Sequence, residues 1–462
     1  MSDRTIKPEG KIFRDPIHDL IRIGPEDWHV VELIDTPEFQ RLRRIRQLGV
    51  GSLTFHGAEH SRFAHSMGVF NFAQRIVDAL CRRHAGEDAV TAYLKEHRRE
   101  VTAAALLHDV GHGPFSHMIE RAFGAHGKHE EMTTRLIQDK ETGIHKTLVR
   151  ARIDPAAVAE IINHTSKHKL LVDIVSSQLD ADRMDYLLRD SYYAGVAYGR
   201  YDAEWLLNAL CIGKDPHAHA ASHGDDASVE WRLCLDKKRG VYAAEQFIMA
   251  RAHMSEQVYF HRATRGYEVL LLNLFDEAKR ACTEGRLPSD TPVVVQSFLI
   301  QEGNLDSQGW LTFDESVMTT AFHAWARSAE KRLSRLAGAY LNRERIYRGV
   351  SLPDASGPEF YEDLNESDLK RDVDWRIDKG EYSVYKGLLS GSATQKDAEE
   401  FSTESMLFSD GDIKKKASAG EAHSELFRDL DRVKRKLWRF YYDSAREDKF
   451  RPVLVKHKLM RA

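Results

Sequence analysis

Apolar residues recur at the three- and four-residue spacing of packed helices along most of this 462-residue chain. The stretch 101–109 is rich in Ala and Leu and free of Gly and Pro, which predicts a buried helix that ends near Gly111. Further helices are predicted over 36–48, from near His65 to about His84, and over 155–164, 240–284 and 315–343. The pattern therefore predicts a mainly α fold.

Short apolar runs near both ends of the chain predict a few strands. Residues 11–16 and 20–23 should form a short N-terminal β-hairpin. Towards the C-terminus, the pattern predicts strands at 345–352 and 453–455, a helix over 421–440, and a flexible polar segment near 390–421. We expect a large helical domain over residues 1–340 and a small α+β region over 341–462.

Composition narrows the class of protein. The chain carries 67 basic and 71 acidic side chains, a formal charge of −4, which does not favour bulk nucleic-acid binding and leaves only a local basic pocket open. Its four cysteines form no CxxC pair, so neither a zinc ribbon nor a disulfide framework is indicated. No apolar run has the length of a signal core or a membrane span. We expect a cytoplasmic protein without a membrane partner.

Three histidines and one aspartate fall within ten residues at the predicted helix end: His108, Asp109, His112 and His117. A buried helix should not end in polar groups unless something satisfies them. Imidazole and carboxylate are standard ligands of divalent metals, and the Gly- and Pro-rich turn lets the backbone approach a ligand closely. The alternative is a polar helix end bonded to its neighbours. We favour a metal site because other parts of the chain offer further ligands.

Two other stretches offer those ligands. His65 lies at the start of a predicted helix, and Arg62 three residues before it suggests an anionic ligand such as phosphate. Residues 179–190 place several carboxylates, including Asp182, among leucines. Taken singly, His65 would more often be a core histidine, and the acidic residues would more often form an internal ion-pair network. The basic side chains over residues 40–46 would more often form a solvated helix face.

Together, His65, His108, Asp109 and Asp182 resemble the metal site of the HD-domain phosphohydrolases. More narrowly, the chain is similar to the deoxynucleoside triphosphate (dNTP) triphosphohydrolases of the sterile-alpha-motif/HD type, without their extra N-terminal domain. The motifs that carry the resemblance are residues 39–43, 47–49, 61–66, 108–117 and 182–186, and it extends from about residue 11 to 347. The resemblance implies an all-helical HD-domain core.

The resemblance also implies roles for individual residues. The metal ligands would be His65, His108, Asp109 and Asp182, and the catalytic set His117, His129 and Glu120. The family's phosphate and sugar contacts fall on Gln47, Leu48, Arg62, His112, Arg183, Tyr186, Asp190, Arg251 and Tyr259. Two His and two carboxylates fit Mg, Mn or Fe better than Zn. The implied reaction is hydrolysis of a dNTP at the α-phosphorus to a deoxynucleoside and inorganic triphosphate, with His117 as the acid.

Two other functions stay open. One is a different HD phosphohydrolase: a nucleotidase, a phosphodiesterase or a nuclease. The arginines at 62, 183 and 251 favour a polyphosphate substrate over these. The other is a nucleotide-sensing regulator that keeps the pocket without turnover. The complete ligand set and His117 argue against it.

The resemblance implies a second nucleotide site between subunits, with Lys11, Asp35, Gln40 and Arg43 recognising GTP or dGTP. A carboxylate can accept from the guanine N–H donors, and an arginine can donate to O6 and N7. The alternative is that Arg43 belongs to a charged helix face and that Asp35 is a simple N-terminal helix charge. We expect a homo-oligomer, a dimer or tetramer, activated by the guanine nucleotide.

Overall fold

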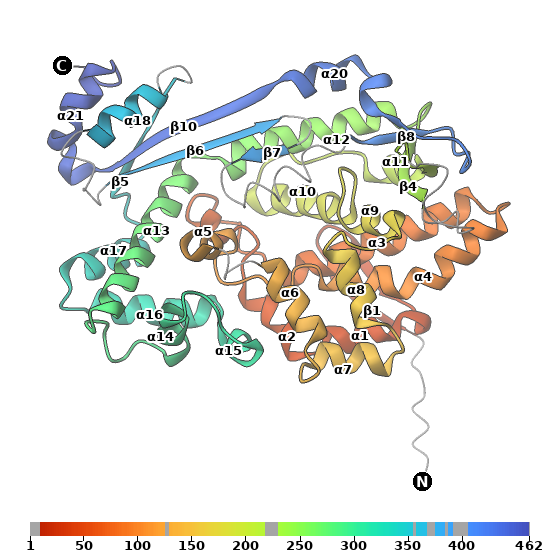
Figure 1. Cartoon of the computed structure of the whole chain (residues 1–462), viewed down its shortest axis with the longest axis horizontal. Coiled ribbons are helices and arrows are strands. Elements are labelled where there is room, and N and C mark those ends of the chain that lie inside the picture. Colours follow the sequence, from red (N-terminus) through yellow and green to blue (C-terminus); the bar gives the residue numbers. More distant parts are fainter. Residues whose placement is uncertain are drawn as a thin grey trace, which may run out of the picture.

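The computed structural model describes residues 10–124, 129–217, 230–353, 357–366, 375–383, 387–390 and 405–461. Helices dominate, as the apolar spacing predicts, so the mainly α expectation is confirmed (Figure 1). The N-terminal hairpin is also confirmed: β1 (Lys11–Asp15) pairs antiparallel with β2 (Asp19–Ile23). None of the described helices is long and apolar enough to cross a membrane.

The helical body contains most of the chain between residues 28 and 341. Its helices are α1 (Trp28–Ile34), α2 (Pro37–Arg41), α3 (Arg62–Arg83), α4 (Asp88–Leu107), α5 (His117–Phe123), α6 (His129–Gln138), α7 (Gly143–Arg150), α8 (Pro155–Ile162), α9 (Lys169–Val175), α10 (Ala181–Ala194), α11 (Ala203–Asn208), α12 (Val241–Met254), α13 (Arg262–Thr283), α14 (Val293–Ile300), α15 (Ser307–Thr312), α16 (Glu315–Ala326) and α17 (Lys331–Leu341). A π-helical turn, Ser255–Tyr259, joins α12 to α13.

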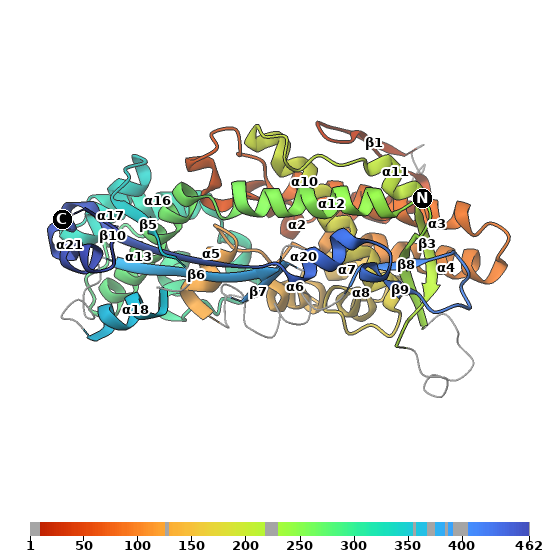
Figure 2. The same cartoon turned by 90° about the horizontal axis from the view of Figure 1, so that it is seen from above.

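Two four-stranded sheets flank this body. One has the order β5 (Tyr347–Ser351), β10 (Lys434–Asp443), β6 (Trp375–Ser383) and β7 (Gly387–Ser390); the other has β3 (Leu210–Lys214), β4 (Trp231–Asp236), β8 (Leu407–Ser409) and β9 (Ser418–Ala419). Strands β6 and β10 run along the long axis of the helical body in both views (Figures 1 and 2). Within the described ranges, the remaining α-helices are α18 (Gly357–Glu366), α20 (Glu425–Arg432) and α21 (Glu447–Lys456).

The C-terminal elements differ from the sequence prediction. Residues 434–443 form a strand rather than a helix, because Phe440 and Tyr442 pack into a small apolar cluster while Tyr441 packs into the main core. Both faces of β10 are therefore buried over residues 440–443, which hides the two-residue alternation of a strand there. Residues 453–455 lie in the helix α21 instead of a strand.

Part of the segment expected to be flexible is regular. Residues 407–409 pair in parallel with β4, and residues 418–419 pair with β8. Residues 391–404 lie outside the described part of the chain. The division at residue 340 stays a prediction, although the β4–β8 pairing joins residues from both sides of it.

The predicted helix 36–48 ends early. Helix α2 ends at Arg41 and one 3₁₀ turn follows, after which Ile45 is extended. The reason is pairing with the segment before α3: the Arg62 amide donates to the Ile45 carbonyl at 2.9 Å, and Gln47 donates to His60 at 3.0 Å. The basic face is also not uniformly solvated, since Arg41 is 1% exposed and donates to the carbonyls of His112 and Phe313.

Candidate active site

Two adjoining cavities contain most of the residues singled out in the sequence. The histidine chamber, about 490 Å³, is lined by His65, His108, His112, His117, His129, Asp109 and Asp182 among others. The aromatic chamber, about 440 Å³, is lined by Phe55, Phe115, Tyr259, Phe260, Leu48 and Asp190 among others. Gln47, Arg62, His117 and Tyr186 line both cavities. The two chambers therefore meet at a shared wall.

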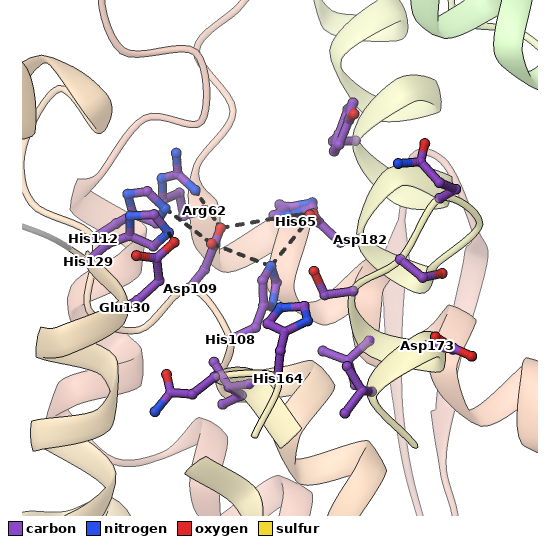
Figure 3. Close-up of a pocket in the computed structure, with 18 of the residues that line it drawn as sticks. Arg62, His65, His108, Asp109, His112, His129, Glu130, His164, Asp173 and Asp182 are labelled. Atoms are coloured by element: carbon purple, nitrogen blue, oxygen red, sulfur yellow. Dashed lines mark hydrogen bonds and ion pairs between the residues drawn. The ribbon is translucent and has the colours of Figure 1, made fainter. Parts of the chain in front are cut away.

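His65 and Asp182 come together from different helices. His65 is in the first turn of α3 and Asp182 in the first turn of α10. The His65 Nε2 atom lies 3.0 Å from an Asp182 carboxylate oxygen, and both side chains face His108 (Figure 3). Helix α10 can approach α3 because residue 68 is glycine: a Cβ there would lie 1.8 Å from Asp185 Oδ1.

His108 and Asp109 follow the end of α4. The His108 Nε2 atom lies 3.4 Å from Asp109 Oδ1 and 3.7 Å from Asp182 Oδ1. Arg62 donates to Asp109 at 2.5 Å and to the hydroxyl of Ser116 at 2.8 and 3.0 Å. Burial alone would raise the pKa of Asp109, but Arg62, His108 and His112 together outweigh it and hold that pKa well below its usual range. Asp109 is therefore a permanent carboxylate.

The donor set fits a divalent metal. His65 Nδ1 is bonded to Asp185 at 2.9 Å and His108 Nδ1 to the Ala105 carbonyl at 2.9 Å, which turns both Nε2 atoms towards the carboxylates of Asp109 and Asp182. Both Nε2 atoms are buried without a hydrogen bond in the described structure. Fixing a ligand imidazole through its other nitrogen is typical of metal sites. Metal ligation would satisfy the two buried atoms.

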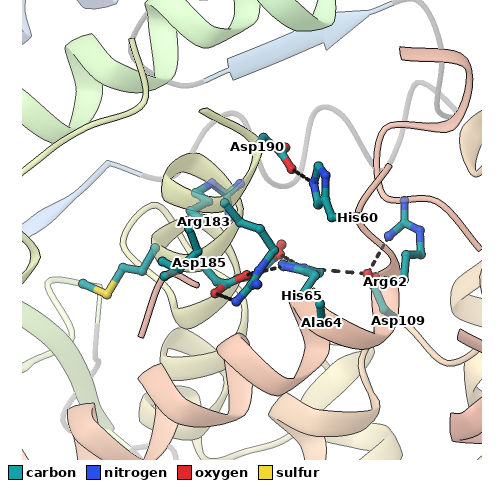
Figure 4. A network of polar contacts seen from close by, with 12 residues as sticks. His60, Arg62, Ala64, His65, Asp109, Arg183, Asp185 and Asp190 are labelled. Carbon is teal, nitrogen blue, oxygen red and sulfur yellow. Dashed lines mark hydrogen bonds and ion pairs between the residues drawn. The ribbon is translucent and has the colours of Figure 1, made fainter. Parts of the chain in front are cut away.

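We call His65, His108, Asp109 and Asp182 the metal cage. A buried network of hydrogen bonds supports it from behind (Figure 4). Asp185 accepts from His65, and Arg189 donates to it at 2.8 Å; His18 lies 2.7 Å from its other oxygen. Burial would lower the pKa of His65, but the carboxylates of Asp182 and Asp185 beside it raise that pKa to about 10 in the absence of a metal. Sequence reasoning missed His18 and Asp185. The signals for Asp185 were its place in the acidic segment 179–190 and in the motif 182–186.

The predicted catalytic residues form one connected group. Glu120 accepts from His117 Nδ1 at 3.1 Å and from His129 Nδ1 at 2.6 Å. The His129 ring stacks on His112 with a centroid separation of 3.8 Å. Burial would raise the pKa of Glu120, but the neighbouring His117 and His129 lower it overall. The side chain of His117 is 58% exposed and lies on the wall shared by both chambers.

A strained turn places His117 there. Phe115 and Ser116 both have left-handed backbone conformations, with φ of 61° and 52°, directly before α5. Such conformations cost free energy for non-glycine residues and are found most often at functional sites. The turn presents His117 to the chambers and the Ser116 hydroxyl to Arg62.

The aromatic chamber contains a second polar chain. Tyr259, in the π-helical turn, donates to Asp190 at 2.9 Å, and His60 lies 2.7 Å from the other Asp190 oxygen. The His60 ring stacks on Tyr193 at 4.5 Å. Leu48 and Gln47 reach the chamber because the chain leaves the helix at Ile45. Sequence reasoning missed His60, which no motif distinguished.

Two sets of predicted residues line neither chamber. Arg183 and Arg251 line neither chamber: Arg183 pairs with Asp180, and Arg251 donates to Gln178 at 2.9 Å. The four residues expected at a second nucleotide site also lie outside both chambers. Among them, Arg43 donates to Gln40 at 2.8 Å and stacks over Phe63 at 3.6 Å, while Asp35 is exposed at the end of α1 and Lys11 lies in β1.

Comparison with known proteins identifies the segment that carries the metal cage. A model of the HD domain matches residues 62–190. The uncharacterized protein YwfO of Bacillus subtilis is 40% identical over 337 residues, covering 73% of this chain and 71% of its own length. A deoxynucleoside triphosphate triphosphohydrolase, SAMHD1 of Gallus gallus, is 33% identical over 302 residues, covering 58% of this chain but 45% of its own length.

Two solved structures share the fold. A phosphohydrolase of Bacteroides thetaiotaomicron has a TM-score of 0.70 at 24% identity, covering 94% of this chain and all of its own. A hypothetical protein of Aquifex aeolicus has a TM-score of 0.69 at 26% identity, covering 96% of this chain and all of its own. The arrangement of the C-terminal sheets with the helical body is therefore part of a recurring architecture.

Proposed function

The chain belongs to the HD-domain phosphohydrolase family, and from that premise we propose that it is a metal-dependent dNTP triphosphohydrolase similar to the sterile-alpha-motif/HD enzymes. The observation that carries the proposal is the shared wall of the two chambers. A cage suited to a divalent metal opens directly into an aromatic cavity, with Arg62, His117, Gln47 and Tyr186 between them. A nucleotide can place its α-phosphate at that wall and its nucleoside in the aromatic chamber.

His65, His108, Asp109 and Asp182 would hold the metal, and their hard donor set favours Mg, Mn or Fe over Zn. When bound, the metal would lower the pKa of a water molecule and polarise the phosphoryl oxygen. Arg62, fixed by Asp109 and Ser116, would neutralise charge on the phosphate. Tyr259 and Asp190 would position the sugar.

The reaction breaks the bond between the α-phosphorus and the 5′ oxygen as a water oxygen adds to phosphorus. His117 would give its proton to the departing 5′ oxygen, because it lies on the shared wall and Glu120 fixes its ring. His129, bonded to the same carboxylate, would help to hold Glu120 in place. The products are a deoxynucleoside and inorganic triphosphate.

Incubation with each dNTP and Mn²⁺, followed by chromatography, tests the proposal. We expect equal amounts of deoxynucleoside and triphosphate. Nucleoside monophosphates, cyclic nucleotides and single-stranded DNA are the comparison substrates for the other HD activities. Release of orthophosphate or pyrophosphate, turnover of a comparison substrate alone, or binding without turnover would overturn it.

We also propose that GTP or dGTP activates a homo-oligomer, a dimer or tetramer, through Lys11, Asp35, Gln40 and Arg43. The support is the resemblance and the surface position of these residues, with Asp35 exposed. GTP should enlarge the assembly in a sizing experiment and raise the rate with dATP. Asp35→Ala should remove both responses while metal content stays the same. An unchanged size and rate with GTP would contradict the proposal.

A further inference from the structure

A charged cluster closes part of the aromatic chamber and is separate from the candidate metal ligands. Arg121, Arg265 and Glu268 line that chamber together with Thr264. They belong to the short helix α5, which begins with His117, and to the first turns of α13. None of these residues lines the histidine chamber. The cluster therefore faces only the part of a ligand that lies away from the metal cage.

Arg265 is held rigidly within this cluster. Asp378, 3% exposed on β6, accepts from both ends of its guanidinium, with the Nε contact at 2.9 Å. Glu268 Oε2 lies 2.7 Å from the remaining Arg265 nitrogen. The long strand β6 thus fixes a wall of the aromatic chamber. The Arg265 charge is thus paired with two carboxylates, and three of its five N–H donors face them.

Arg121 is less fully engaged. Its Nη1 donates to the same Glu268 oxygen at 3.0 Å, while its Nη2 lies 3.8 Å from Asp378, beyond a hydrogen bond. Within the described residues, every hydrogen bond of Arg121 comes from Nη1. Burial and the neighbouring Arg265 lower the pKa of Arg121. Because its hydrogen bonds among the described residues come from Nη1, Arg121 keeps the N–H donors of Nε and Nη2 for a ligand that offers acceptors.

Thr264 gives independent evidence for a ligand. It is 6% exposed, lines the chamber, and its hydroxyl has no hydrogen-bond partner among the described residues. A buried hydroxyl without a partner costs stability, because its hydration is lost without compensation. A ligand that hydrogen-bonds to the Thr264 hydroxyl would supply the missing partner.

We propose that Arg121 and Thr264 form a base-reading subsite that favours guanine, then thymine, over adenine and cytosine. The inference rests on the proposed function, which places the nucleoside in this chamber. An arginine can only donate hydrogen bonds, and guanine presents two acceptors, O6 and N7, in the arrangement that a guanidinium matches. On the corresponding edge, thymine presents the single acceptor O4. Adenine and cytosine present an amino group at the corresponding position, which sets donor against donor.

Binding of deoxynucleosides tests the subsite without relying on turnover. Deoxyguanosine and deoxyadenosine are titrated by calorimetry into the full-length Asp35→Ala variant, so that the proposed second guanine site does not contribute. We expect deoxyguanosine to bind at least about tenfold more tightly, a difference typical of one good base contact. Arg121→Gln should bring the ratio close to one, because an amide can donate and accept. Arg150→Gln, an exposed arginine on α7, is the matched control and should keep the ratio.

Thr264→Val separates a ligand-binding role from a structural one. Replacing an unpartnered buried hydroxyl by a methyl group should raise the melting temperature of the free protein and weaken deoxyguanosine binding. A lower melting temperature with unchanged binding would overturn the role of Thr264. Equal binding of the two deoxynucleosides, or a ratio that Arg121→Gln leaves unchanged, would overturn the subsite.

The same preparations distinguish this inference from the proposed function. If no dNTP releases triphosphate, the proposed function fails, and the binding ratio still decides whether the subsite reads the base. If all four dNTPs are hydrolysed with equal catalytic efficiency and deoxynucleosides bind equally, the function stands and the subsite is wrong.

Discussion

The histidine chamber and the aromatic chamber are built in different ways. The ligand groups of the histidine chamber come from residues 65, 108, 109 and 182, all within the segment 62–190 that the HD-domain model matches. The aromatic chamber draws on four separate segments, 47–62, 115–121, 186–190 and 255–268. One of its walls is fixed by Asp378, far along the chain.

This difference separates the residues proposed to carry out the reaction from those proposed to select the nucleoside. The metal cage uses residues whose type follows from the reaction, so their identity is constrained and a short motif reveals them. Under the proposed function the residues of the aromatic chamber would decide which nucleoside fits, and many side-chain combinations can form such a wall. Changes in the first chamber should remove activity, whereas changes in the second should alter preference.

The largest effect is expected in the metal cage. His108→Gln with Asp109→Asn should lower dNTP hydrolysis at least about a thousandfold, because several kcal/mol of transition-state stabilisation depends on the metal. The amide that replaces the Asp109 carboxylate can still accept from Arg62, so the fold should persist. Elemental analysis should show loss of bound metal, and circular dichroism an unchanged helix content. Lys146→Gln, an exposed lysine on α7, is the control. Full metal occupancy in the double variant would contradict the ligand assignment.

A smaller effect is expected on the shared wall. His117→Ala should slow hydrolysis of natural substrates about a hundredfold, the usual effect of removing a general acid. A substrate with an activated phenolate leaving group needs no proton and should lose far less. The two rates are compared by initial-velocity assays, with His253→Ala, an exposed histidine on α12, as the control. Equal losses on both substrates would show that His117 is not the acid.

The smallest effect is expected in the aromatic chamber. We expect the protein to prefer dATP over ATP, because Leu48 and Tyr259 line the chamber and would crowd a 2′ hydroxyl. Leu48→Ala should reduce that preference about tenfold while the rate with dATP changes little. Catalytic efficiencies on both nucleotides measure it, and Leu287→Ala, outside both chambers, is the control. Comparable catalytic efficiencies on ATP and dATP in the unaltered protein would contradict the prediction that the aromatic chamber selects the sugar.

The sequence predicted several local elements well. The hairpin, α3 and the helix that ends before His108 follow from apolar spacing and from turn residues. It failed at β10, because burial of both faces removes the alternation that marks a strand, and at Arg41, because the partners of a buried cation lie far away in sequence. The phosphate contacts expected at Arg183 and Arg251 stay predictions.

The sequence by itself determined the prediction of the metal cage: four ligands of two types, His and Asp, each near a helix start or end, in short motifs that resemble those of a known family. Only the tertiary structure decided how the cage is supported and what adjoins it. The bond between His65 and Asp185 joins residues 120 positions apart, and that between Arg265 and Asp378 joins residues 113 positions apart. Such pairs leave no periodic signal, because each partner depends on how separate helices and strands pack. The unpartnered hydroxyl of Thr264 is visible only once that packing is known.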